Sequence, residues 1–109
     1  MPGPFHWLQK QIVRPPRLKY DPERHLPGPF LNLNGKEYFR NDISPLSRHG
    51  RRIECSHYLP TVQPRNAMPC VIYCHTNSGG RPEANEIVLT LLPNEISVFV
   101  LDFVGSGLS

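Results

Sequence analysis

The last forty residues of the chain, 70–109, most constrain its fold. Two short apolar runs, 70–74 and 98–101, bracket a glycine-rich turn and a segment long enough for a helix. This order is typical of a βαβ unit, in which a helix joins two parallel strands and covers their sheet. Because neither run alternates apolar with polar residues, we expect both strands to be buried on both faces.

The segment between the two runs has the pattern of an amphipathic helix. Pro82 suits the first turn, where its missing N–H is not needed, and Pro93 with Asn94 ends the pattern. A stripe at spacings of three and four is expected to lie on the sheet; it consists of Ala84, Ile87, Val88, Leu91 and Leu92. The second strand is expected over 96–103, with a turn at 105–107.

Residues 35–59 predict a β-hairpin ahead of this unit. In its first strand, 37–43, Tyr38 and less regularly Ile43 are the inward candidates. The second strand, 51–59, alternates at period two, which indicates one buried face. Its inward set is Ile53, Cys55, His57 and Leu59. Ser47 to Gly50 would form the turn, with Gly50 at a positive φ.

The first 34 residues are interpreted as a Pro-rich basic leader, and 35–109 as the folded portion. More than half of the thirteen prolines fall in the first thirty residues, and a short helix is possible over 5–13. The net charge of +3 is too small to favour nucleic acid as a partner.

The sequence also excludes several locations and classes. No apolar run approaches the ~20 residues of a membrane span, so stable membrane insertion is not expected, and no signal peptide is visible. The odd number of cysteines, three, argues against a disulfide framework. We expect a cytoplasmic chain.

Residues 75–80, His-Thr-Asn-Ser-Gly-Gly, follow the first strand of the βαβ unit. Ligand sites in open α/β sheets lie at this carboxyl end of the strands. Successive backbone N–H groups there can bind an anion or a developing oxyanion. The alternative is a glycine-rich turn that only connects strand to helix, and the residues alone leave both possibilities open.

Three stretches resemble the α/β-hydrolase family. Val-Ile-Tyr-Cys-His-Thr-Asn-Ser-Gly-Gly-Arg at 71–81 resembles its strand and oxyanion loop. The stretch 98–109 resembles the next strand with its Asp-x-x-Gly-x-Gly-x-Ser signature, and 14–23 resembles the leader of a serine-aminopeptidase-like branch. The implied fold class is α/β: the N-terminal part of an α/β-hydrolase fold, with an antiparallel hairpin leading into a parallel βαβ unit.

The resemblance implies roles for a few residues. The backbone N–H of Asn77 would be the oxyanion donor, beside Thr76, which replaces the family's usual Gly. Asp102 and Gly105 would hold the turn after the second strand rather than act in catalysis. No cofactor and no metal are implied.

Two other kinds of site are suggested by single motifs: a serine nucleophile and a zinc site. Ser78 could be the nucleophile, because residues 76–80 nearly match the Gly-x-Ser-x-Gly elbow. Against this, Thr76 replaces the first Gly and no His follows Ser78 in the chain. A zinc site could be built from Cys55, His57, Cys70, Cys74 and His75. Their spacings are not those of a zinc ribbon or finger, so we expect a half-buried His and core thiols.

A whole domain of this kind runs to ~200–250 residues, so we expect the nucleophile, acid and His to lie beyond this polypeptide. The full-length protein would hydrolyse a small-molecule ester or amide, or a peptide, through an acyl-enzyme. Alone, the chain is expected to be inactive, since the triad supplies most of the rate. An exposed sheet edge predicts self-association. The alternative is a non-catalytic interaction module that uses this edge.

Overall fold

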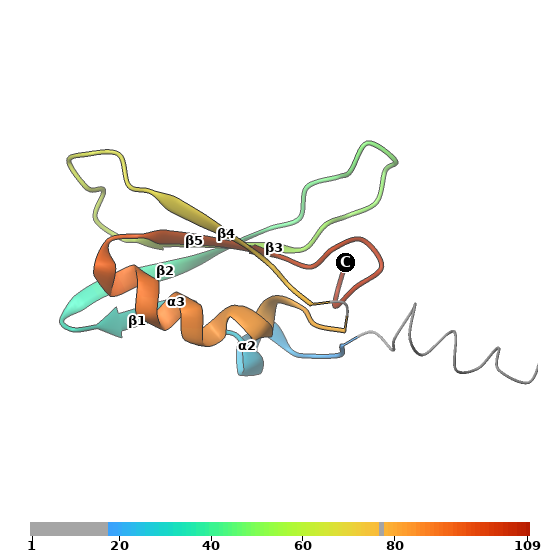
Figure 1. Cartoon of the computed structure of the whole chain (residues 1–109), viewed down its shortest axis with the longest axis horizontal. Coiled ribbons are helices and arrows are strands. Elements are labelled where there is room, and N and C mark those ends of the chain that lie inside the picture. Colours follow the sequence, from blue (N-terminus) through green and yellow to red (C-terminus); the bar gives the residue numbers. More distant parts are fainter. Residues whose placement is uncertain (1–17, 77) are drawn as a thin grey trace, which may run out of the picture.

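The fold, seen in a computed structural model that describes residues 18–76 and 78–109, is a small mixed α/β domain built on one five-stranded sheet (Figure 1). The strand order is β1-β2-β3-β5-β4. All neighbours are antiparallel except β4 and β5, which are parallel. The strands are β1 Phe30–Leu33, β2 Lys36–Ile43, β3 Cys55–Pro60, β4 Cys70–Cys74 and β5 Ser97–Leu101.

The helical segment between β4 and β5 confirms the predicted βαβ unit. It consists of η1 Arg81–Ala84, α3 Asn85–Leu91 and η2 Leu92–Asn94. Pro82 lies in the first turn as expected, and Glu95, in the left-handed conformation, ends the segment. A further one-turn helix, α2 Pro22–His25, precedes the sheet. Within the described ranges, no helix has the length and apolar character needed to cross a membrane.

The core lies between one face of the sheet and α3. α2 and α3 lie on the same side of the sheet (Figure 1). The predicted stripe is confirmed for Ala84, Val88 and Leu92, which are fully buried, and Leu91 packs beside them, but Ile87 is exposed. The sheet contributes Tyr38, Tyr58, Val98 and Val100.

The hairpin of β2 and β3 is confirmed, with Ile43 opposite Cys55. Gly50 closes its turn at a φ of +75° and donates its N–H to the carbonyl of Ser47. Tyr38 is inward as predicted, whereas Ile43 is exposed.

The predicted inward set of β3 is wrong for His57 and Leu59, whereas Cys55 is buried as predicted. The core-facing residues of β3 are Ser56 and Tyr58, on the opposite face from His57 and Leu59, which are only half-buried. The pattern misled because polar Ser56 is buried for its hydrogen bonds, so polarity did not mark the outward face.

The prediction that the 70–74 strand is buried on both faces is also wrong. β4 is the last strand of the sheet, and Val71, Ile72 and both of its cysteines are exposed. β5, not β4, is the interior strand: Val98 and Val100 are buried and its other face is half-buried. The cause is the strand order, because β5 inserts between β3 and β4 and leaves β4 with one neighbour.

The sheet begins within the range expected as leader. β1 pairs with β2 through a tight turn at Asn34 and Gly35, whose φ angles are 54° and 81°. Two consecutive positive φ values are the geometry of the type I′ hairpin turn. Leu26 is buried as well, so residues just before β1 pack on the domain. The helix predicted over 5–13 lies outside the described residues.

The role of the helix as the cover of the sheet can be tested at Leu92. Leu92→Ala should lower the free energy of unfolding by about 2–5 kcal/mol, because it leaves a cavity in the core. Leu89→Ala, on the same helical segment but 43% exposed, is the matched control and should cost less than about 0.5 kcal/mol. Urea unfolding followed by circular dichroism measures both, and equal losses would contradict this packing.

Candidate functional site

The loop after β4 is tied to the end of β5 by His75. The ring of His75 is buried, and its Nε2 accepts the N–H of Phe103 at 2.9 Å. Since Nε2 accepts, the ring proton is on Nδ1, which donates to the carbonyl of Thr76 at 2.6 Å. Both ring nitrogens are therefore engaged in holding the loop, and His75 is not free to serve as a base for Ser78.

Glu83, from the first helical turn, occupies the other side of this loop. Its carboxylate accepts the N–H of Thr76 at 2.9 Å, the hydroxyl of Thr76 at 2.5 Å and the hydroxyl of Tyr73 at 2.9 Å. Burial alone would raise the pKa of Glu83, but the bonds from Thr76 and Tyr73 bring it below its usual range. A side chain at Gly79 would collide with this carboxylate. The loop thus folds around an anion from its own chain.

The structure describes Thr76, an oxyanion candidate, and Ser78, the candidate nucleophile. Thr76 is exposed, and its N–H is committed to Glu83. Ser78 is exposed in the turn. Asn77 lies outside the described residues, so its role as oxyanion donor stays a prediction.

The cysteines and histidines weighed as metal ligands are scattered over the sheet. Cys70 Sγ lies 3.8 Å from His57 Nε2. His57 is half-buried as expected, and burial lowers its pKa. Of the three thiols only Cys55 is in the interior, so the prediction of core thiols is wrong for Cys70 and Cys74. In the described ranges, no three His, Cys, Asp or Glu side chains gather closely enough to hold a metal ion.

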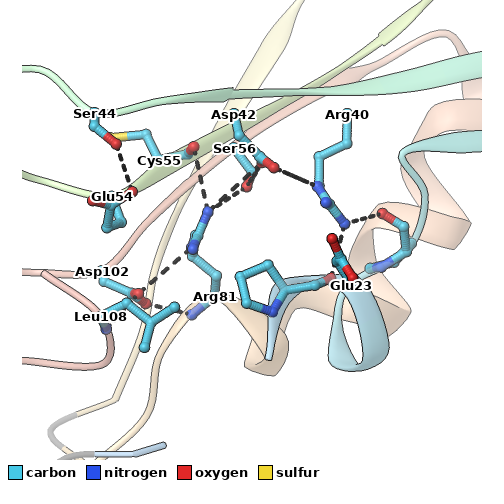
Figure 2. A network of polar contacts seen from close by, with 12 residues as sticks. Glu23, Arg40, Asp42, Ser44, Glu54, Cys55, Ser56, Arg81, Asp102 and Leu108 are labelled. Atoms are coloured by element: carbon cyan, nitrogen blue, oxygen red, sulfur yellow. Dashed lines mark hydrogen bonds and ion pairs between the residues drawn. The ribbon is translucent and has the colours of Figure 1, made fainter. Parts of the chain in front are cut away.

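Asp102 and Arg81 form a buried ion pair at the carboxyl end of β5 (Figure 2). Asp102 Oδ1 accepts the backbone N–H of Arg81 at 2.7 Å, and Oδ2 lies 3.5 Å from Arg81 Nε. The hydroxyl of Tyr20 accepts from Arg81 Nε at 2.6 Å and donates to Asp102. Leu108 donates its N–H to the same carboxylate at 2.9 Å. Every oxygen of Asp102 therefore has a donor.

The network extends across the sheet to β2. Arg81 Nη1 donates to Ser56 Oγ at 2.8 Å and lies 3.7 Å from Asp42. Arg40 Nε reaches both carboxylate oxygens of Asp42 at 3.0 Å, and Arg40 Nη1 donates to the carbonyls of Pro22 and Pro27 (Figure 2). A chain of polar contacts thus connects the start of the helical segment, β2, β3, the turn after β5 and the segment before β1.

The Asp-x-x-Gly-x-Gly-x-Ser stretch is one structural unit around Asp102. A Cβ on Gly107 would lie 2.5 Å from Asp102 Cγ, and Gly107 has a φ of +49°. A Cβ on Gly80 would lie 2.9 Å from Asp102 Oδ1. The hydroxyl of Ser109 accepts the N–H of Glu54 at 2.8 Å and donates to the carbonyl of Asp102. The carboxylate of Asp102 acts as a structural centre of the turn, as the resemblance implies.

Two hollows of about 380 and 540 Å³ flank residues 61–69, the segment before β4. The 75–80 loop lies at the other end of β4. Neither hollow is lined by a residue of the 75–80 loop. The candidate loop therefore lies apart from both hollows, at the carboxyl end of a parallel strand, where open α/β sheets place ligand sites.

Comparison with known proteins gives no family: no family model, no curated protein and no solved structure matches the chain.

The close packing at Asp102 predicts a difference between two glycines of the same turn. Gly105→Ala should cost about 1–2 kcal/mol of stability, because Gly105 has a φ of +83° but open space around it. Gly107→Ala should cost ~1–3 kcal/mol more, because its Cβ also collides with Asp102. Denaturant unfolding of the two variants in parallel measures the difference, and a smaller loss for Gly107→Ala would contradict the packing.

The raised pKa of Tyr20 predicts that the folded state loses stability in alkali. Burial and the hydrogen bond to Asp102 raise the pKa of Tyr20, and burial raises the pKa of Tyr58 to about 12. The folded state therefore holds these phenolic protons more tightly than the unfolded chain. The resulting stability is complete below the ordinary value of 10.0 and is lost as the pH rises above it.

The free energy of unfolding, measured in urea from pH 8 to pH 11, should fall over the upper part of this range. Tyr20→Phe should be less stable at pH 8 by about 1–3 kcal/mol, because Arg81 and Asp102 lose a buried partner. The variant should also lose less between pH 10 and pH 11 than the unchanged protein. Identical pH profiles would show that Tyr20 does not contribute.

Proposed function

We propose that this chain is the N-terminal part of a serine hydrolase of the α/β-hydrolase fold, serine-aminopeptidase-like, that cleaves an ester or amide bond through an acyl-enzyme. One observation carries the proposal. The 75–80 loop lies at the carboxyl end of a parallel strand, directly before the helix of a βαβ unit, and the Asp102 turn ends the next strand. Both elements stand in the order and context that the resemblance implies.

The arrangement around the loop supports this proposal. In α/β-hydrolases one oxyanion donor is a backbone N–H of a loop between a strand and a helix. Here Thr76 already gives its N–H to Glu83, so the donor we assign is Asn77, the residue that follows. Thr76 and Glu83 position the loop, and the Thr at the family's usual Gly position is accommodated because its hydroxyl also bonds Glu83.

The catalytic residues of the proposed enzyme lie beyond this polypeptide. A triad needs a histidine bonded to the nucleophile, whereas both nitrogens of His75 are bonded elsewhere. Ser78 is therefore not the nucleophile in this proposal, and the 109-residue chain alone is inactive. The free edge of β4 is where a further strand of the longer protein would pair.

The proposed substrate is a small-molecule ester or amide, or a peptide, and no cofactor takes part. We place the enzyme in the cytoplasm. All three cysteines are free, as thiols are in a reducing compartment. The second candidate, a non-catalytic interaction module, is favoured by one observation: the side chain of Ile72 on the free edge is 63% exposed.

The native protein, treated with a fluorophosphonate probe and analysed by intact mass, tests the proposal. A labelled species well above 12.4 kDa is expected, because the nucleophile belongs to the longer polypeptide. The purified 109-residue chain and its Ser78→Ala variant are the controls and should both stay unlabelled. An unlabelled native species of 12.4 kDa would refute the proposal, as would labelling of the short chain that Ser78→Ala abolishes.

A further inference from the structure

Within the described residues, the outer edge of β4 has no strand paired to it. β4 ends the sheet and pairs with β5 alone among the strands of the described ranges. The N–H of Ser97, at the start of β5, donates to the carbonyl of Pro69 at 2.9 Å. Because the ladder alternates along a strand, the N–H and C=O groups of Cys70, Ile72 and Cys74 face away from β5. They are available to another strand.

This edge lacks the features that keep sheet edges apart. Natural edge strands are protected by charged residues, prolines or bulges. The five residues of β4 include no charge and no proline, and Val71, Ile72 and both cysteines are exposed. Two such strands brought together would suffer no repulsion between like charges, which opposes pairing on other edges.

The sequence of β4 is close to a palindrome. Cys-Val-Ile-Tyr-Cys, read backwards, exchanges only Val71 and Tyr73. In an antiparallel pair with its two-fold axis at Ile72, each Cys70 faces Cys74 of the second copy, and each Val71 faces Tyr73. A β-branched residue opposite an aromatic one is a favourable cross-strand pair. Only this register aligns all five residues, and any shift removes pairs from the ladder.

We propose that the 109-residue chain forms a two-fold dimer in which β4 pairs antiparallel with β4 of a second copy, Ile72 against Ile72. The two five-stranded sheets become one continuous sheet, and the contact is isologous, as two-fold symmetry requires. The inference does not rest on the proposed function. In a longer polypeptide that supplies its own next strand, the same edge is occupied and the dimer does not form.

A disulfide between Cys70 and Cys74 of two copies would form only in this register of the two strands. Cys70 Sγ lies beside His57, on the face opposite Tyr73, whose hydroxyl bonds Glu83 of the helical segment. Opposed residues that exchange both backbone bonds have Cα atoms about 5.5 Å apart. That separation lies within the ~4.4–6.8 Å range of disulfides. Oxidised glutathione can therefore join Cys70 to Cys74 of the second copy: the two thiols give up two electrons and two protons, and two molecules of reduced glutathione are released.

Single variants make this cross-link a test of register. The unchanged chain and Cys55→Ser, whose thiol is buried, should both give a band at twice 12.4 kDa on non-reducing gels. Cys70→Ser alone and Cys74→Ser alone should give none, because each then opposes a thiol to a serine. An equimolar mixture of Cys70→Ser and Cys74→Ser should recover the band in about half of the dimers, since random exchange makes half of them mixed.

A second experiment tests the edge itself without any disulfide. Under reducing conditions, light scattering after size exclusion should give the unchanged chain twice the mass of 12.4 kDa. Ile72→Lys should reduce it to the monomer mass, because it opposes two like charges at the two-fold axis. Phe30→Lys, at an exposed position on the other edge strand, is the matched control and should remain a dimer. Circular dichroism confirms that both variants fold.

Three results would overturn the proposal: a monomeric unchanged chain, a cross-link formed by either single cysteine variant alone, or an assembly that Ile72→Lys leaves intact. Dissociation by Phe30→Lys instead would move the contact to β1 and refute it equally. None of these outcomes depends on fluorophosphonate labelling, so this inference and the proposed function can fail separately.

Discussion

The buried ion pair of Arg81 and Asp102 is the interaction on which the rest of this structure depends. Removing one partner of such a pair leaves an uncompensated charge and typically costs about 3–5 kcal/mol, which is a large share of a small domain's stability. Here both charges are almost fully shielded from solvent and every oxygen of Asp102 has a donor. The pair joins the helix start to the end of β5 and draws in Tyr20 from before the sheet. The candidate loop is therefore held at both ends, by this network and by His75.

Much of the fold could be predicted from the sequence because its signals are local. The apolar stripe of the helix, the turn at Gly50 and the two strands of the βαβ unit follow from spacing alone. Asn34-Gly35 is an equally strong hairpin signal. It lies at the end of the segment interpreted as leader, so β1 is not among the predicted strands. The exposure of β4 was not predictable from spacing, because it arises from strand order: β5 inserts between β3 and β4, and no pattern within five residues records which strand is an edge.

The candidate site divides in the same way. The glycines and the position of the 75–80 loop are local features, and the sequence placed them correctly after a strand and before a helix. The contacts that shape the loop are not local. Tyr20 and Asp102 lie 82 positions apart, and Arg81 meets Ser56 across 25. Glu83 is closer, seven residues from Thr76, but its role was hidden because a glutamate in a first helical turn is ordinarily explained by the helix dipole alone. Ser56 is likewise buried because Asp42 and Arg81 bond its hydroxyl. In an alternating pattern such a serine is read as an outward residue.

The order β3-β5-β4 has a consequence for how the chain is made. A ribosome extends a polypeptide at ~5–20 residues per second, and β5 is the last of the described strands to emerge, after both of the strands it separates. Until residues 97–101 are synthesised, β3 lacks its second neighbour and β4 has none. Asp102, which comes next, then brings the charge that Arg81 needs. β1, β2 and β3 can therefore pair in the order in which they are made, but the rest of the sheet cannot. β4, made earlier, joins the sheet only when β5 has paired with β3 and offers it a parallel neighbour.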